Sequence, residues 1–383
     1  MRLTLNQDEL DFRSIVDDWV QKNLPDDLRQ MARLGEHLTR KEFSRWCAIL
    51  DSNGWSVPAW PKEYGGTGWS PLRRHLFEEQ LLLSGAPRNT SAGIAMLGPI
   101  LIAFGTQDHK NKYLPSIRRG ETFWAQGFSE PGSGSDLASL RTSAIRDGSH
   151  FIVNGHKIWT SYAQSSEMMF ALVRTNPEAK PQSGISFLLI DMASPGIKVR
   201  PIRTLDGGTD LNEVFLDDVR VPVDNLIGEI DRGWDYAKHL LGFERTGIAG
   251  VAVSKQQFFR LKRLMSERSI SPAFRHKVAR TEIDLLGMDA LILRTLTENP
   301  ASRPGPEASM LKIQGTRLRQ TIQHLLMELA GPEGLRNAED PGDYVERDLQ
   351  WLAANYLDSR KVSIYGGTNE IQANVVAKAV LGL

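Results

Sequence analysis

The sequence has almost no cysteine, no excess of either charge and no long apolar run. Cys47 is the only cysteine among 383 residues, which excludes a disulfide framework and a cysteine-based zinc site and indicates a reducing compartment, so we expect a cytoplasmic protein without a metal site. Lysine and arginine together number 46, as do aspartate and glutamate, and such a neutral chain has no field to attract nucleic acid or an anionic membrane. No run approaches the roughly 18 apolar residues of a membrane span, and the N-terminus lacks a signal-peptide pattern. We therefore expect neither nucleic-acid binding nor membrane insertion.

The spacing of apolar residues divides the chain into helices, then strands, then helices. Residues 8–120 show mainly helical steps of three to five, with predicted helices at 41–52 and 72–83. After Gly228 the helical spacing returns and continues to the end of the chain. Between them we predict short strands separated by turn residues, at 150–159, 168–174, 184–190, 197–203 and 213–221. This spacing of strands is typical of a small barrel or sandwich.

An Asn154-Gly155 pair lies between two apolar stretches within residues 150–159. Asn-Gly between apolar stretches is a strong hairpin signal, because both residues tolerate the left-handed backbone of a tight turn. We therefore predict a turn at this pair, with Lys157–Ser161 on the outgoing strand.

Glycines and serines alternate in Gln126–Asp136 (QGFSEPGSGSD). The backbone N–H groups of such a loop can surround an anion or the polar edge of a ring, and the hydroxyls add donors. The segment is not a dinucleotide-binding fingerprint, because Leu137 stands where the third glycine would be and no strand–helix–strand unit surrounds it. The alternative interpretation is a plain connector.

Lys157–Ser161 (KIWTS) combines an indole with two hydroxyls. Trp159 could stack on an extended aromatic ring while the hydroxyls of Thr160 and Ser161 approach the polar edge of that ring. The alternative is a tryptophan in the core of a barrel.

Glu244 stands within the apolar stripe of a helix that we predict to begin near Trp234. The stripe consists of Ala237, Leu240, Leu241, Glu244, Ile248 and Val251. Burial raises the pKa of a carboxyl group and brings it closer to that of a general base acting near neutrality. The alternative is a glutamate at the edge of the stripe that pairs with a nearby arginine. Arg245 points about 100° further round the helix, where it is free to meet a ligand.

The segment Ile364–Gln372 (IYGGTNEIQ) precedes the last predicted helix. Its two glycines would let the backbone approach a ligand closely. Thr368 is a candidate N-cap and Glu370 suits the first helical turn. An ordinary capped terminal helix explains the same residues.

Together these four segments resemble the acyl-CoA dehydrogenase family, and they occur in that family's order along the whole chain. Three further stretches are similar to landmarks of the family: 60–66 (WPKEYGG), 102–107 (IAFGTQ) with 112–115 (KYLP), and 219–222 (VRVP) with 225–229 (NLIGE). Within the family, the chain is most similar to bacterial large subunits of pimeloyl-CoA-type dehydrogenases. That narrower resemblance implies a place in fatty acid or dicarboxylic acid degradation.

The resemblance implies a fold of the α+β class that is mainly α. The N-terminal all-helical domain would span residues 1–121, the central β-barrel domain 122–230 and the C-terminal four-helix bundle 231–383. FAD would lie between barrel and bundle.

The resemblance also implies which residues form the binding sites. The expected FAD contacts are Gln126, Phe128, Ser129, Ser135, Trp159, Thr160, Ser161, Thr368, Asn369 and Glu370. The coenzyme A thioester would meet Ser135 and Arg245, and Tyr365 would border the acyl pocket.

The catalytic base is expected at Glu244. Most members of the family carry a glutamate directly after the tyrosine of the C-terminal motif, where this chain has Gly366. The isovaleryl and long-chain members place it on a bundle helix before an arginine, as in Glu244-Arg245. Glu244 would then remove the α-proton while a hydride leaves for the flavin, giving a trans-2-enoyl-CoA. The backbone N–H of Gly366 would hold the thioester oxygen.

The resemblance also implies partner proteins, and two stretches of the chain differ from the family's motifs. An electron-transfer flavoprotein would reoxidise the flavin, and the chain would form a homotetramer or a heterotetramer with a related small subunit. Residues 266–275 lack the family's Arg-x-x-Phe-Gly, and 328–334 only partly match its Gln-x-x-Gly-Gly-x-Gly, which implies that the adenine end of FAD is bound differently or by another chain. The alternatives are a non-catalytic partner subunit and an oxidase that passes electrons to oxygen.

Overall fold

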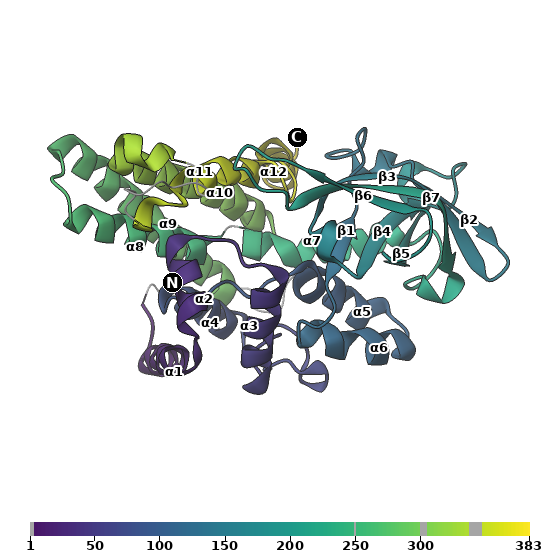
Figure 1. The fold of residues 1–383 in the computed structure, drawn as a ribbon, viewed down its shortest axis with the longest axis horizontal. Helices are drawn as coiled ribbons and strands as arrows, with labels where there is room; N and C mark the ends of the chain where they lie inside the picture. The colour runs from purple at the N-terminus through teal and green to yellow at the C-terminus, as the bar shows by residue number, and fades with distance from the viewer. Residues whose placement is uncertain (1–3, 249, 299–304, 337–346) are drawn as a thin grey trace. The chain divides into compact units, whose positions relative to one another are not determined.

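The computed structural model describes residues 4–248, 250–298, 305–336 and 347–383, without the side chains of residues 241–248, 298 and 347. Helices α1 to α6 precede strands β1 to β7, and helices α7 to α12 follow them (Figure 1). This order confirms the predicted succession of helices, strands and helices. The chain forms two compact units: residues 1–39, 69–88 and 245–383 make up the first, and residues 40–68 and 89–244 the second. In the part of the chain that the structure describes, no helix is long and apolar enough to cross a membrane.

The first unit is helical. Its helices are α1 (Gln7–Asn23), α2 (Asp26–Leu34), α4 (Pro71–Leu83), α8 (Val251–Ser266), α9 (Pro272–Glu298), α10 (Pro306–Ala330), α11 (Leu352–Asp358) and α12 (Asn369–Val376). Helix α10 packs against α8, α9, α11 and α12. Its buried Leu311, Leu318, Ile322 and Leu325 recur at helical spacing and lie in one hydrophobic core with Phe258 of α8.

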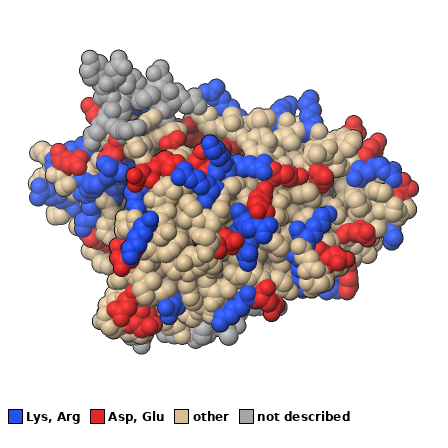
Figure 2. Space-filling model, turned by 60° about the horizontal axis from the view of Figure 1, so that its bottom comes forward, with Lys and Arg blue, Asp and Glu red and all other residues tan. Residues whose placement is uncertain are grey.

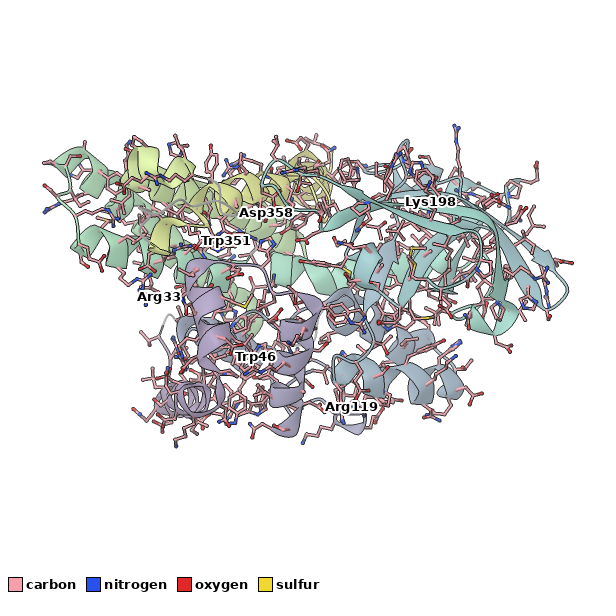
Figure 3. All side chains as sticks on the ribbon, in the orientation of Figure 1. Arg33, Trp46, Arg119, Lys198, Trp351 and Asp358 are labelled. Carbon is pink, nitrogen blue, oxygen red and sulfur yellow. The ribbon has the colours of Figure 1, made fainter. Side chains whose placement is uncertain are left out.

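The second unit contains a seven-stranded sheet and the helices α3 (Arg40–Ser52), α5 (Gly98–Phe104), α6 (Gln107–Arg118) and most of α7 (Gly233–Ile248). The strands are β1 (Trp124–Gly127), β2 (Ser143–Asp147), β3 (His150–Ser161), β4 (Met168–Arg174), β5 (Ile185–Asp191), β6 (Ile197–Ile202) and β7 (Leu211–Pro222). The strand order is β1-β4-β2-β3-β7-β6, and β5 pairs with β4. Residues 169–173 of β4 are fully buried, as expected for a strand covered on both faces. Trp46 of α3 is also fully buried (Figure 3).

The predicted turn at Asn154-Gly155 is wrong, because β3 runs straight through this pair. The turn between β2 and β3 lies instead at Gly148, which has a φ of 57°. Asn154 stands at a register shift between β3 and β7, and its side chain exchanges two hydrogen bonds with Asp218, at 2.9 and 2.8 Å. A Cβ atom on Gly155 would lie 2.7 Å from the Cα atom of Thr142. The Asn-Gly pair thus forms a bulge where two segments cross closely.

The stretch 60–66 has a structural role in the second unit. The indole of Trp60 is buried and donates a hydrogen bond to the carbonyl of Ile94 at 3.1 Å. A Cβ atom on Gly66 would lie 1.6 Å from the carbonyl oxygen of Trp60. Only glycine fits this position, which explains why the stretch ends on a glycine pair.

Candidate functional site

A buried lysine fixes the loop that follows β1. Lys157 of β3 is fully buried, and its Nζ atom lies 2.8 Å from the Oε1 atom of Glu130. The same ammonium group donates to the carbonyls of Phe128 at 3.2 Å and Leu172 at 2.8 Å. All three of its donors therefore have acceptors, which a charge buried at this depth requires.

Glu130 is held from a second side as well. It is only 9% exposed, and its carboxylate accepts hydrogen bonds from the backbone N–H groups of Arg141 at 2.7 Å and Thr142 at 2.9 Å. Burial by itself would raise the pKa of this carboxyl group, but the charge and hydrogen bond of Lys157, together with the bonds from Thr142 and Arg141, outweigh burial and lower the pKa. Glu130 is therefore ionised at neutral pH.

The end of β3 presents an exposed indole. Trp159 has a φ of 60°, a left-handed conformation that is uncommon outside glycine, and it is 55% exposed. The β3–β7 register shifts between Lys157 and Thr160 at this point. Ser161 is also exposed, whereas Thr160 is fully buried. The three predicted FAD contacts of this strand therefore divide, with Trp159 and Ser161 reaching solvent and Thr160 facing the interior.

The buried hydroxyl of Thr160 has no hydrogen-bond partner among the described residues. Because this hydroxyl loses its hydration without compensation, Thr160→Val is expected to leave the free energy of unfolding unchanged or to raise it by up to about 1 kcal/mol. Chemical denaturation of the flavin-free protein measures this, with Ser161→Ala as the exposed control. A loss of stability in Thr160→Val alone would contradict the expectation.

The other predicted residues of this unit have different environments. Gln126 lies on β1 opposite Phe170 of β4, and Ser135 is exposed. The ring of Phe128 is buried and makes edge contacts with the rings of Phe170 and Phe187, at centroid distances of 5.8 and 6.2 Å. Ser129 is half-buried, and its carbonyl accepts a hydrogen bond from the N–H of Ile158 at 2.9 Å. The structure thus brings Ser129 next to the strand that carries Trp159.

The C-terminal motif lies in the first unit as a glycine turn followed by a capped helix. Gly366 and Gly367 have φ angles of 63° and 80°, and Tyr365 is partly exposed. The Thr368 side chain accepts a hydrogen bond from the N–H of Ile371 at 3.2 Å, which confirms Thr368 as the N-cap of α12. Among the described residues, none accepts a hydrogen bond from the N–H of Gly366, so this donor is available to a ligand.

A polar stripe on α10, missed by the sequence analysis, fixes this motif. Lys312 is buried and donates to the Oδ1 atom of Asn369 at 3.0 Å, and the Thr316 hydroxyl donates to the same atom at 3.2 Å. Burial is the main cause that lowers the pKa of Lys312. The sequence could have indicated this stripe, because Lys312 and Thr316 are polar, lie four residues apart and stand among apolar residues of α10. The predicted FAD contact Asn369 therefore has its side-chain oxygen occupied within the protein.

Gln372 links the glycine turn to α10. Its side chain is buried and donates to the carbonyl of Gly366 at 3.0 Å. Its Oε1 atom accepts from the hydroxyl of Ser309 on α10 at 2.7 Å. The orientation of the Gly366 peptide is thus set by a side chain six residues away in the sequence.

The first turn of α7 packs directly on β5. A Cβ atom on Gly233 would lie 2.6 Å from the carbonyl carbon of Ser186 and 2.9 Å from the nitrogen of Phe187. Asp231, with a φ of 64°, donates its N–H to the Ser186 hydroxyl at 2.8 Å, and its carboxylate accepts from the hydroxyl of Thr175. These contacts fix the point at which α7 begins.

Helix α7 carries the predicted base. Ala237 and Leu240, the first two members of the predicted stripe, are buried. The side chains of Glu244 and Arg245 lie outside the described residues, so the burial of Glu244 stays a prediction. Glu370, a predicted FAD contact, lies at the first turn of α12, and its pKa is lowered by hydrogen bonds from its own backbone N–H and from Thr368.

Basic and acidic side chains are interspersed on the face in Figure 2. In the described ranges, no group of three or more histidine, cysteine, aspartate or glutamate residues is placed to hold a metal ion.

Three family models match successive parts of the chain. Their descriptions are acyl-CoA dehydrogenase N-terminal domain, for residues 6–121, middle domain, for 125–219, and C-terminal domain, for 231–381. The chain is 35% identical over 390 residues to the acyl-CoA dehydrogenase IpdE1 of Mycobacterium tuberculosis (strain ATCC 25618 / H37Rv), covering 98% of each chain.

Two solved structures are similar over the same length. The "Tcur3481-Tcur3483 steroid ACAD" has a TM-score of 0.87 and 30% identity, covering 100% of this chain and 99% of that chain. The ChsE4-ChsE5 complex from Mycobacterium tuberculosis has a TM-score of 0.85 and 28% identity, covering 100% and 99%. These matches confirm the predicted acyl-CoA dehydrogenase fold, with an N-terminal helical domain, a middle domain that is a β half-barrel, and a C-terminal helical domain.

Proposed function

Because the chain belongs to the acyl-CoA dehydrogenase family, we propose that it oxidises the α,β bond of an acyl-CoA thioester to a trans-2-enoyl-CoA with FAD as its cofactor. Acyl-CoA dehydrogenase activity follows from the family. We also propose the cofactor, the roles of individual residues, the acyl group and the partners.

Trp159 is the observation that carries the FAD assignment. A large aromatic side chain with a left-handed backbone costs free energy, and such strain is concentrated where a ligand site requires it. An exposed indole can stack on a flavin ring and cover it from water. The exposed hydroxyl of Ser161 and the open N–H of Gly366 provide donors suited to a flavin edge or a thioester oxygen.

The chain's own residues supply acid–base chemistry and orientation. Glu244 is assigned the removal of the α-proton, and the resulting negative charge on the thioester oxygen is assigned to the N–H of Gly366. Gln372 restrains the glycine turn that carries this N–H, through its bond to the Gly366 carbonyl in the following peptide. When bound, FAD supplies the hydride acceptor for the β-hydrogen. Arg245 is assigned to coenzyme A, and Tyr365 to the border of the acyl pocket.

For the acyl group we favour a bulky steroid-derived CoA thioester over pimeloyl-CoA. Support comes from the similar structure titled a steroid ACAD, at 30% identity over the whole chain. It also comes from Gly366, which has no side chain at the position where most members of the family carry a glutamate.

A related second chain is the proposed partner. Two similar structures carry paired names, Tcur3481-Tcur3483 and the ChsE4-ChsE5 complex. The altered stretches at 266–275 and 328–334 support the same proposal, because another chain could supply contacts to the adenine end of FAD. They also favour the second candidate function, a non-catalytic subunit that completes a partner's site.

Anaerobic titration of the purified chain tests the proposal. We expect the chain purified alone to be yellow, with a visible flavin band that bleaches on adding a steroid-derived acyl-CoA and returns on adding electron-transfer flavoprotein. Pimeloyl-CoA and straight-chain acyl-CoAs serve as comparison substrates. A colourless chain that yields a yellow, active complex only through its partner would support the non-catalytic role, and peroxide formation in air without another acceptor would indicate an oxidase.

A further inference from the structure

We infer that the buried pair of Glu130 and Lys157 positions the FAD-facing wall of the second unit, by holding the loop 128–133 against β3 and thereby setting the places of Ser129 and Trp159. The inference rests on the proposed function for the identity of the ligand. Its geometric basis lies entirely within the second unit.

One ammonium group joins three separate segments. Lys157 belongs to β3, and it bonds to Glu130 and the carbonyl of Phe128 in the loop and to the carbonyl of Leu172 in β4. Because the three acceptors surround a side chain with no solvent exposure, the loop cannot move away from β3 without breaking the bonds of Lys157 to Glu130 and to the Phe128 carbonyl. The loop and both strands therefore behave as one element.

The loop itself is closed by its own backbone. The N–H and carbonyl groups of Glu130 and Ser133 bond to each other in both directions at 2.9 Å. The buried hydroxyl of Ser133 donates to the carbonyls of Asp136 at 2.9 Å and Leu137 at 3.3 Å. Displacement of Glu130 is thus transmitted to the whole turn.

The residues next to the pair are those assigned to FAD. Ser129 precedes Glu130, and its carbonyl accepts the N–H of Ile158, which follows Lys157. The next residue is Trp159, at the point where the backbone turns left-handed. The ion pair is therefore one residue from Ser129 on the loop and two from Trp159 on the strand.

A buried ion pair is a costly way to stabilise a core. Its presence here therefore favours a role in positioning Ser129 and Trp159. Replacing a buried ion pair with apolar residues of similar size is often neutral or stabilising. Burial is the largest influence on Lys157 and lowers its pKa to about 8, against the attraction of Glu130 and with a small further lowering by Arg174. Arg174 bonds instead to the carbonyls of Ala138, Leu140 and Pro181.

A double-mutant cycle of Lys157 and Glu130 separates the effect of the pair on the FAD site from its effect on stability. Lys157→Met and Glu130→Gln are each expected to lower the melting temperature, because each leaves the other partner buried without its counter-charge. The double variant is expected to melt at a higher temperature than either single variant, because it leaves no buried charge without its counter-charge. It should still bind FAD about tenfold to a hundredfold more weakly and exchange the Ile158 amide hydrogen faster than the wild type, because the Phe128 and Leu172 carbonyls lack their common donor.

Lys262→Met is the matched control. Lys262 and Glu282 form an ion pair of 2.9 Å on the exposed surface of the first unit, and its loss should change neither FAD affinity nor exchange at Ile158. A double variant with wild-type FAD affinity and wild-type exchange at Ile158 would overturn the inference, even if the single variants fail to fold. A wild-type chain that binds no FAD, alone or with its partner, would instead overturn the proposed function.

Discussion

Glu244→Gln is expected to slow flavin reduction by acyl-CoA about 10²- to 10⁴-fold while FAD stays bound. An amide fills nearly the same space as the carboxylate but cannot accept the α-proton, and a positioned general base contributes an acceleration of this size. Anaerobic stopped-flow measurement of flavin bleaching gives the rate, and the visible spectrum before mixing gives the flavin content. The rate in the variant should also lack the rise with pH that is expected of the wild type if a carboxylate removes the proton.

Asp235→Asn provides the control on the same helix. Asp235 lies in the first turn of α7, where its carboxylate is paired with Arg232 at 3.0 Å and Lys238 at 2.8 Å. Removing this exposed charge is expected to leave flavin reduction unchanged. Undiminished reduction in Glu244→Gln would remove Glu244 from its role as the base.

The secondary structure was predictable wherever the spacing of apolar residues is compatible with only one kind of element. Strand β4 coincides with the predicted range 168–174, and α4 ends at the predicted Leu83. The Asn154-Gly155 pair is compatible with two local structures, a hairpin turn or a bulge. The bulge forms because Asp218, far away in the sequence, pairs with the Asn154 side chain. A local pattern holds no information on such a partner.

The candidate site was predictable as motifs but not as a network of contacts. The sequence indicated Ser129, Trp159 and Thr368 by their residue types and neighbours. The buried supports Lys157 and Lys312 were missed, because lysine in a strand or helix is usually an exposed residue. Their roles depend on carbonyl and amide acceptors from other segments, which appear only once the chain has folded.

Gly233→Ala is expected to destabilise the protein by about 3 kcal/mol, at the upper end of the usual cost of overpacking. The added methyl group would meet the backbone of Ser186 and Phe187 at 2.6–2.9 Å, and β5 has no room to withdraw because residues 185–190 are fully buried. The melting temperature should fall by roughly 4 °C for a chain of 383 residues, as thermal unfolding followed by circular dichroism would measure. Helix α7 can accommodate the methyl group only by moving off β5.

That movement also has a predicted effect on activity. Glu244 lies about 16 Å along the helix axis from Gly233, because each residue adds about 1.5 Å, so a tilt at the first turn is enlarged at the base. We therefore expect kcat to fall below that of the wild type at temperatures where the variant is still folded. Gly287→Ala in α9 is the control: its added Cβ meets nothing within 4 Å, so it should stabilise its helix by up to about 1 kcal/mol and leave kcat unchanged. Equal behaviour of the two variants would show that contact between α7 and β5 does not determine where the base lies.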